Sequence, residues 1–189
     1  MPNTAYVSTG KPKVTGAVYR APLGTTLPTD ASTALNSAFK ELGYVSEDGV
    51  TNNNTPDSDT VKDWGGNTVL VLQNEKPDEW TLTLIEALNP EVLKTVYGDS
   101  RVTYDSGAGT ITVQATADQL ADKSFVIDMV MKGGAIKRVV IPNGSLSELG
   151  EIVYKGDEAV GYEITLNALP DSSGVTHYEY IKLAAAATT

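Results

Sequence analysis

The residues that could carry chemistry are few in this chain of 189 residues, and their spacing matches no catalytic motif. Cysteine is absent and the only histidine is His177, so a thiolate nucleophile is excluded and no base stands beside a serine nucleophile. The lack of cysteine also excludes a disulfide framework and suits a reducing compartment. Neither a P-loop nor a dinucleotide-binding glycine motif is present. The sequence therefore predicts a protein that is not an enzyme and takes no cofactor.

Some acidic residues are spaced in ways that could suit metal binding or hydrolysis. One cluster contains three aspartates, Asp57, Asp59 and Asp63. It fails the calcium-loop pattern, because Lys62 occupies the position of the turn glycine and Thr68 that of the bidentate glutamate. Glu79 and Glu163 fall on expected strands, and their separation, which would decide a glycosidase reading, cannot be seen in sequence. Exposed strand carboxylates are more often a solvated face, so we expect no metal site and rank a hydrolase last.

The charge balance argues against nucleic-acid binding. The formal net charge is −10, and the only adjacent basic pair is Lys137 and Arg138. A nucleic-acid binder normally carries a basic stripe that contacts phosphates. No apolar run approaches the ~20 residues of a membrane span, and residues 1–12 lack the apolar core of a signal peptide. We therefore expect no membrane association.

Two segments have helical signals. Over residues 31–42 the apolar positions recur every three or four residues, with Asp30 as a plausible N-cap and Gly43 as a stop. The second helix opens at Asn89-Pro90-Glu91 and ends before Gly98, with Asn as N-cap and Pro in the first turn. The sequence predicts helices over 31–42 and about 90–97.

Most of the remaining chain alternates apolar and polar residues with a period of two, which is typical of strands. The expected strands are 14–20, 44–46, 68–74, 79–84, 110–115, 125–132, 136–141, 152–154, 160–168 and 178–183. We expect hairpins across 75–78, across Gly133-Gly134 and across 155–157. The fold class is mainly β with α, an antiparallel β-sandwich or partial barrel flanked by a short helix. No linker divides the chain, so residues 1–189 are expected to form one domain.

Three segments are too polar or too small to fold alone: an N-terminal arm at 1–12, a long loop at 47–67 and a C-terminal tail at 184–189. Trp64 stands out, because a large aromatic in a polar loop suits a surface that another chain covers. The alternative is that Trp64 pins the loop onto its own domain. The candidate residues for contacts between subunits are Asn52, Asn53, Asn54, Asp57, Asp59 and Trp64.

The opening of the chain resembles that of a known family. The matching segments are Gly10–Val14, the block GAVYRAPLGT over 16–25, and LGYVSEDG over 42–49. They resemble the major tail (tail tube) proteins of siphophages, particularly those of Gram-positive hosts. The resemblance is close over the first quarter of the chain and beyond that is one of layout.

The resemblance implies a structural virion protein that forms hexameric rings. Rings of this family stack into the hollow tail tube that conducts phage DNA, and each subunit adds strands to an inner barrel. The implied partners are further copies of the chain, the tape-measure protein and tail-tip or terminator proteins, with DNA in transit. The protein would assemble in the host cytoplasm and reside in the virion tail.

In a DNA conduit, lumen carboxylates would repel phosphates and keep the polymer moving. The candidates on strands are Glu79, Asp128 and Glu163. The plainer alternative is that the acidity serves solubility only. The alternative function is a β-sandwich recognition module, carbohydrate-binding or adhesin-like. It would use Trp64, Tyr178 and Tyr180 as a stacking platform.

Overall fold

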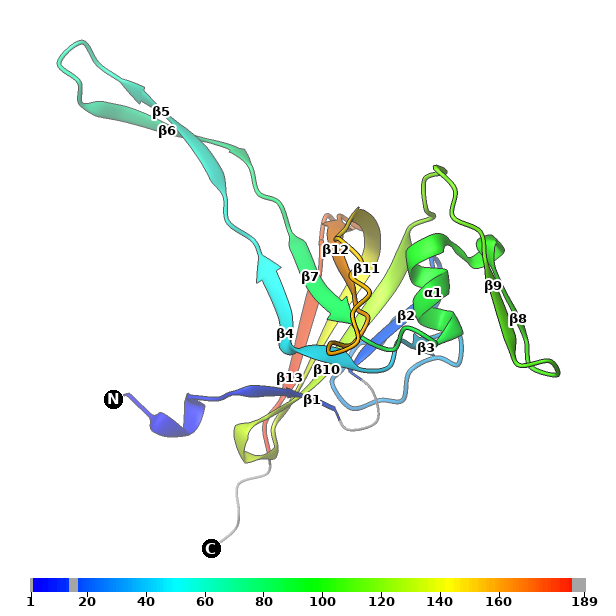
Figure 1. Cartoon of the computed structure of the whole chain (residues 1–189). Helices are drawn as coiled ribbons and strands as arrows, with labels where there is room; N and C mark the ends of the chain where they lie inside the picture. The colour runs from blue at the N-terminus through cyan, green and yellow to red at the C-terminus, as the bar shows by residue number, and fades with distance from the viewer. Residues whose placement is uncertain (1, 14–16, 185–189) are drawn as a thin grey trace, which may run out of the picture.

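The protein, seen in a computed structural model that describes residues 2–13 and 17–184, is built on one nine-stranded antiparallel sheet (Figure 1). The main path runs β3-β2-β10-β11-β12-β7-β4, while β1 pairs with β10 and β13 pairs with β11. These strands are β1 (Gly10–Pro12), β2 (Val18–Pro22), β3 (Lys40–Glu41), β4 (Val45–Asn53), β7 (Glu79–Leu84), β10 (Lys123–Met131), β11 (Ile136–Leu149), β12 (Tyr162–Leu169) and β13 (Tyr178–Lys182).

Two separate hairpins and a few helical segments complete the structure. The hairpins are β5 (Asp57–Lys62) with β6 (Thr68–Glu75), and β8 (Val102–Asp105) with β9 (Thr110–Val113). The α-helix is α1 (Pro90–Tyr97), and the 3-10 turns are η1 (Thr4–Tyr6), η2 (Asp99–Arg101) and η3 (Lys132–Gly134). The mainly β class with a short helix is confirmed, and the sheet does not close into a barrel.

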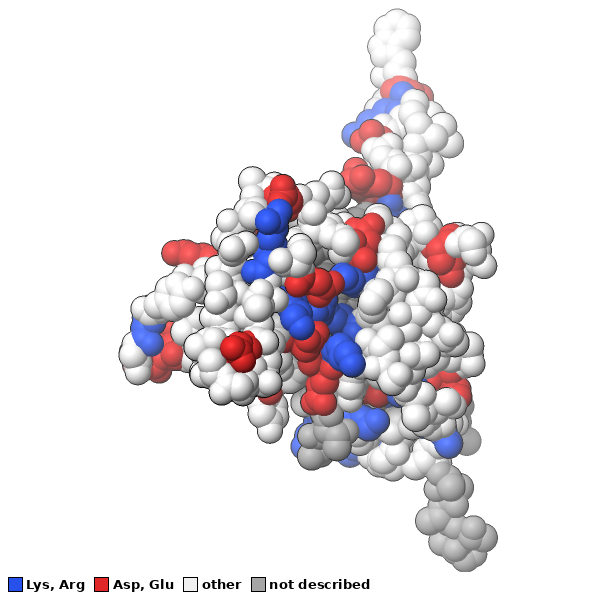
Figure 2. Space-filling view, turned by 90° about the vertical axis from the view of Figure 1, so that its right-hand side faces the viewer, with Lys and Arg blue, Asp and Glu red and all other residues white. Residues whose placement is uncertain are grey.

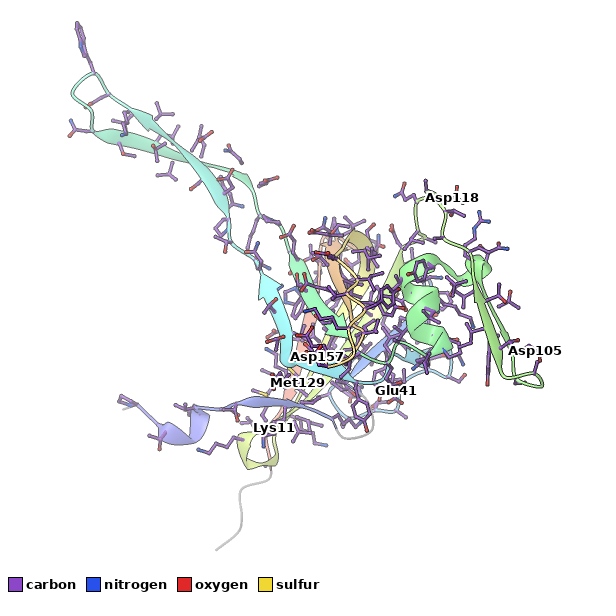
Figure 3. All side chains as sticks on the ribbon, in the orientation of Figure 1. Lys11, Glu41, Asp105, Asp118, Met129 and Asp157 are labelled. Carbon is purple, nitrogen blue, oxygen red and sulfur yellow. The ribbon has the colours of Figure 1, made fainter. Side chains whose placement is uncertain are left out.

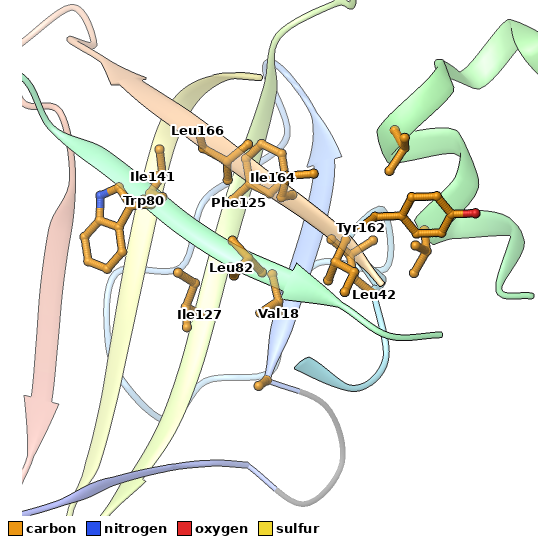
Figure 4. Close-up of a cluster of buried hydrophobic side chains, with 14 of the residues drawn as sticks. Val18, Leu42, Trp80, Leu82, Phe125, Ile127, Ile141, Tyr162, Ile164 and Leu166 are labelled. Carbon is orange, nitrogen blue, oxygen red and sulfur yellow. The ribbon is translucent and has the colours of Figure 1, made fainter. Parts of the chain in front are cut away.

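The long strand β11 makes the sheet fold over on itself. Its first part pairs with β10 on one edge and β13 on the other, and its second part pairs with β12 from Asn143 onward. The register shifts where Pro142, which has no N–H to donate, interrupts the ladder. The two halves thus face each other as a sandwich, and the main core fills the space between them (Figure 4). It includes Val18, Trp80, Leu82, Phe125, Ile127, Ile164 and Leu166.

Helix α1 forms where the sequence predicts it. The Asn89 side chain accepts a hydrogen bond from the Glu91 backbone N–H at 2.9 Å, and Pro90 fills the first helical position. Its apolar residues Val92, Leu93 and Val96 are buried in the main core. Local capping and tertiary packing agree here, so the prediction is confirmed.

The predicted helix over 31–42 is wrong. Residues 31–39 form bends and turns, because short polar side chains bond the nearby backbone instead of a helical ladder. Asp30 accepts from the backbone N–H groups of Ser32 and Thr33, and Asn36 accepts from that of Ala38. The apolar residues of this segment belong to two different cores. Leu42 lies in the main core, while Leu35 and Phe39 pack on the opposite face of β10, in a second core.

A buried ion pair fastens this irregular segment to the sheet. Arg138 of β11 donates to both carboxylate oxygens of Asp128 on β10, at 2.6 and 2.9 Å. The same guanidinium donates to the backbone carbonyls of Asp30 and Thr33 at 3.1 and 2.8 Å. Asp128 is 4% exposed and Arg138 is 2% exposed. Segment 23–39 therefore covers the second face of β10, so that neither face of this part of the strand is open to solvent.

Several pairings differ from those the sequence predicts. Strand β6 pairs with β5 and not with β7, and β7 lies between β12 and β4. Residues 152–154 are not a strand, and β12 takes β11 and β7 as partners. The β10–β11 hairpin around 133–134 and strand β13 are confirmed.

The end segments are only partly described. Within the predicted arm 1–12, residues Gly10–Pro12 pair with β10. The predicted strand 14–20 starts outside the described residues and appears as β2. Of the predicted tail 184–189, only Ala184 is described.

Candidate assembly surfaces

The predicted loop 47–67 is mostly strand, and its middle belongs to a long hairpin that stands away from the sheet (Figure 1). We call residues 54–77 the hairpin arm. The ladder between β4 and β7 ends at Asn53 opposite Glu79, and the β5–β6 ladder begins at Asp57 opposite Glu75. Between them each leg carries a proline, Pro56 or Pro77, which cannot donate to a ladder.

Both faces of the hairpin arm carry exposed apolar side chains. On one face Val61 lies opposite Leu70, and Leu72 opposite Asp59; the other face carries Val69 and Val71. Every residue of β5 and β6 is exposed, and among the described strands these two pair only with each other. Figure 3 shows side chains standing out along the arm with no other part of the chain beside them. An isolated two-stranded hairpin is marginally stable in water, so this surface is suited to burial by another molecule.

A tight turn at the end of the hairpin arm presents Trp64. The Asp63 carboxylate accepts from the backbone N–H and the side-chain amide of Asn67, at 2.8 and 3.0 Å. These bonds hold the pKa of Asp63 below its usual value, with the Asn67 side chain as the largest cause. Gly66 takes the positive φ of 86° that the turn requires. Trp64 is fully exposed at 105%, which argues against the alternative that it pins the loop to its own domain.

At the root of the hairpin arm, the buried carboxylate of Asp78 is hydrogen-bonded to side chains from three segments of the chain. Asp78 accepts from Thr176 at 2.5 Å, from the Trp80 indole N–H at 3.0 Å and from Asn52 at 2.8 Å, and lies 2.5 Å from His177 Nδ1. Burial raises the pKa of Asp78, but the hydrogen bonds from Thr176, His177 and Asn52 outweigh it and leave the pKa lowered. His177 thus has a structural contact here, with no serine or cysteine beside it in this cluster.

The candidate contact residues fall into two groups. Asn52 and Asn53 lie on β4 at the root, where Asn53 donates to Glu79 at 3.1 Å. Asn54 begins the hairpin arm, and Asp57 and Asp59 lie on β5, where Asp59 accepts from Asn74. Trp64 lies at the tip. The exposed apolar residues of β6 were not among the candidates, although their alternation was visible in the sequence.

Strands β4, β7, β12 and the second part of β11 form a layer with one apolar and one polar face. On β7 the buried Trp80, Leu82 and Leu84 alternate with Glu79, Thr81 and Thr83. On β12 the polar positions are Glu163, Thr165 and Asn167, and the hydroxyls of Thr81 and Thr165 lie 3.1 Å apart. Glu79 and Glu163 therefore share the polar face, but Asp128 does not, because it is buried against Arg138 in the other half of the sheet.

The same layer has two open edges. One is β4, whose single partner in the described part of the chain is β7. The other is the second part of β11: its ladder with β10 ends at Gly144 opposite Lys123, so within the described residues 145–149 pair on the β12 side alone. Unpaired edges are templates for strand addition. Successive strands of the layer are antiparallel, so β4 and β11 run in opposite directions.

A charged cluster covers the face beside α1 (Figure 2). Arg20 contacts Glu91 at 2.9 Å and Asp99 at 2.8 Å, while Lys94 and Lys123 pair with the same two carboxylates. Burial raises the pKa values of Glu91 and Asp99, but these cations outweigh it and leave them lowered. Since the charges are paired within the chain, this face is a mixed network and not a basic stripe for nucleic acid.

Other functional readings find less support. The described residues hold no group of three or more His, Cys, Asp or Glu side chains placed to share a metal ion. Tyr178 and Tyr180 stack with ring centroids 6.2 Å apart on β13, against the second core, whereas Trp64 lies at the tip of the hairpin arm. These three aromatic residues therefore form no common platform. Among the described helices, none has the length and apolar character needed to cross a membrane.

The sequence matches the model of a known protein family. The model of the family "Phage tail tube protein" matches residues 12–189, nearly the whole chain. The chain belongs to the phage tail tube protein family. A comparison with curated proteins found no match. The match extends the resemblance of the first quarter across the sheet, the hairpin arm and α1, and makes the protein a structural tail component.

Proposed function

We propose that this tail tube protein forms rings through the open edges of the four-stranded layer, and that six copies complete a ring. The observation that carries the proposal is the antiparallel direction of β4 and the second part of β11. When copies are related by rotation about the tube axis, β4 of one copy meets β11 of the next. The two strands are then antiparallel, and the ladder continues from subunit to subunit. Such a head-to-tail interface closes into a ring and removes both edges.

A ring of six such layers has 24 strands. Barrels of about 16–18 strands already enclose an aqueous channel. With a strand spacing of ~4.8 Å and a tilt of ~40°, 24 strands give a backbone diameter of about 48 Å. The polar face, with Glu79 and Glu163, lines this channel, because the opposite face is occupied by the core. Carboxylates on the wall repel phosphates, so DNA passes without binding.

The hairpin arms join successive rings. They continue strands β4 and β7 beyond the end of the layer, so each arm leaves the ring and reaches the next one (Figure 1). Burying the six exposed apolar residues of one arm, most of them about half exposed, contributes roughly 5–10 kcal/mol. That is comparable to the ~4–15 kcal/mol lost on association. A single arm is therefore marginal, and six acting together bind strongly.

The remaining parts of the proposal follow from the family. The protein has no enzymatic role and resides in the virion tail, where it meets the tape-measure and tail-tip or terminator proteins. Assembly takes place in the host cytoplasm, and the phage is a siphophage of a Gram-positive host. Residues 1–189 act as one domain, with residues 1–12 and 184–189 as further contacts between copies.

The test is polymerisation of the purified protein and of a variant in which residues 54–77 are replaced by Asn-Gly. The full chain should give hollow tubes with stacked rings by negative-stain electron microscopy over a concentration series. The variant keeps the sheet, which circular dichroism checks, and should give no tubes. A matched control shortens the β8–β9 hairpin at its tip (105–109) and should polymerise. Tubes of normal length from the variant without the arm would overturn the stacking role.

Charge reversal tests the lumen. Virions that carry Glu79→Lys and Glu163→Lys should release their DNA more slowly, and most strongly at low salt, because lysines on the wall bind phosphates. Reversal of Asp157, which is exposed and lies outside both the polar face and the hairpin arm, is the control. Unchanged release kinetics at low salt would place the polar face outside the channel.

A further inference from the structure

A pocket lies at the end of the layer opposite the root of the hairpin arm. The arm leaves β4 after Asn53, whereas the pocket is formed around Val45–Val50 at the start of this strand, where residues 46–49 bulge out of the ladder. Its volume is about 510 Å³. In rings that stack head to tail, the arm of one copy faces this end of a copy in the next ring.

The pocket has an apolar floor, and its rim carries two acidic residues, Glu47 and Asp48, together with Lys11. Ala17, Val50, Ile127 and Met129 form the floor, and all four belong to the main core or pack against it. Lys11 of β1 and Met129 of β10 mark this region in Figure 3. Methionine adapts its shape to a partner and makes favourable contacts with aromatic rings. The floor is therefore suited to an aromatic side chain from outside.

Neither acidic residue of the rim forms an ion pair within the described chain, although Lys11 also lines the pocket. Glu47 and Asp48 are exposed, and neither forms an ion pair; Asp48 meets only the Ser46 hydroxyl, at 3.4 Å. At the tip of the hairpin arm, Lys62 is also exposed, and the described residues offer it no ion pair. Lys62 stands two positions from Trp64. The tip thus presents an aromatic ring with a cation beside it, complementary to an apolar floor with a carboxylate rim.

We propose that Trp64 of one copy docks into this pocket of a copy in the next ring, with Lys62 paired to Glu47 and Asp48. The inference rests on the proposed function, since it needs stacked rings, and it names the contact that stacks them. It also accounts for the well-bonded turn at Asp63 and Asn67, which fixes the direction of an otherwise fully exposed tryptophan. Preorganisation of this kind lowers the entropy lost on binding.

Because the chain contains no cysteine, a pair of introduced cysteines reports this contact without background. We would assemble tubes from Trp64→Cys/Ser46→Cys, oxidise them and separate the chains on a non-reducing gel. A ladder of linked chains is expected. The matched control, Trp64→Cys/Thr165→Cys, places the second thiol on the polar face and should stay monomeric. Tubes that form but give no ladder with Ser46→Cys, or an equal ladder with the control, overturn the inference and leave the proposed function intact.

A charge swap keeps the contact testable if the cysteine variant fails to assemble. Lys62→Glu should raise the concentration needed for polymerisation at least tenfold, and addition of Glu47→Lys and Asp48→Lys should restore it. Restoration supports the contact, and equal defects in the single and combined variants overturn it. If the unmodified chain forms no tubes under any condition, including with a tail-tip nucleus, the proposed function fails and this inference fails with it.

Discussion

Replacement of Asp78 by alanine tests how the root of the hairpin arm is held. The change removes the acceptor shared by Asn52, Trp80, Thr176 and His177. The Trp80 indole N–H is buried and loses its partner, which costs about 1–3 kcal/mol. The other three donors lie nearer the surface and can reach water, so each costs roughly 0.5 kcal/mol.

The expected loss is therefore about 3 kcal/mol, a large part of the ~5–15 kcal/mol that stabilises an ordinary domain. For a chain of this length it corresponds to a fall of about 10 °C in Tm. Urea unfolding followed by circular dichroism measures it. Asp59→Ala, which removes one exposed acceptor on the hairpin arm, should cost less than ~0.5 kcal/mol.

A double-mutant cycle separates the cost of the unpaired Trp80 indole N–H from the cost of the other lost hydrogen bonds. In a Trp80→Phe background there is no N–H to strand, so Asp78→Ala should cost about 1–3 kcal/mol less than in the original chain. A loss below 1 kcal/mol in the original chain, or the same loss in both backgrounds, would refute the reasoning.

Three further predictions concern the subunit. Arg138→Ala leaves the buried Asp128 with only the longer contact to Lys13 at 3.5 Å and should cost about 3 kcal/mol, measured by urea unfolding. Gly43→Ala should cost about 2 kcal/mol in thermal melts, because φ is +72° and an added Cβ would lie 2.0 Å from the Glu86 carboxyl carbon. The lowered pKa of Asp78 makes its contribution complete above the usual value of ~3.9 and lost as the pH falls through the folded value. The difference in unfolding free energy between the original chain and Asp78→Ala should therefore shrink as the pH falls below ~3.9, measured by urea unfolding over a pH series.

The sequence predicted the helix α1 correctly and the helix over 31–42 wrongly. The difference is whether the cap, the first turn and the buried face all favour a helix. At Asn89 and Pro90 the cap, the first turn and the buried face all favour a helix. At 31–42 the apolar spacing was right, but side chains such as Asp30 and Asn36 bond the backbone, and Arg138 takes two carbonyls. Periodicity alone cannot reveal that its apolar residues serve two cores.

The hairpin arm was visible in the sequence only in part. The period-two pattern of 68–74 correctly indicated a strand, but both faces of this strand are exposed. Asp128 shows a different outcome. Alternation on β10 placed it on a solvated face, although segment 23–39 covers that face and Arg138 neutralises the charge.

The paired prolines at the root have a mechanical consequence. Ladder hydrogen bonds stop at Asn53 and Glu79 and resume at Asp57 and Glu75, so Pro56 and Pro77 sit in a short joint between wall and arm. In a tube assembled as proposed, bending strain collects at these joints because the bonded wall is stiffer. The tube then curves by tilting whole rings, and the bore keeps its width along the curve.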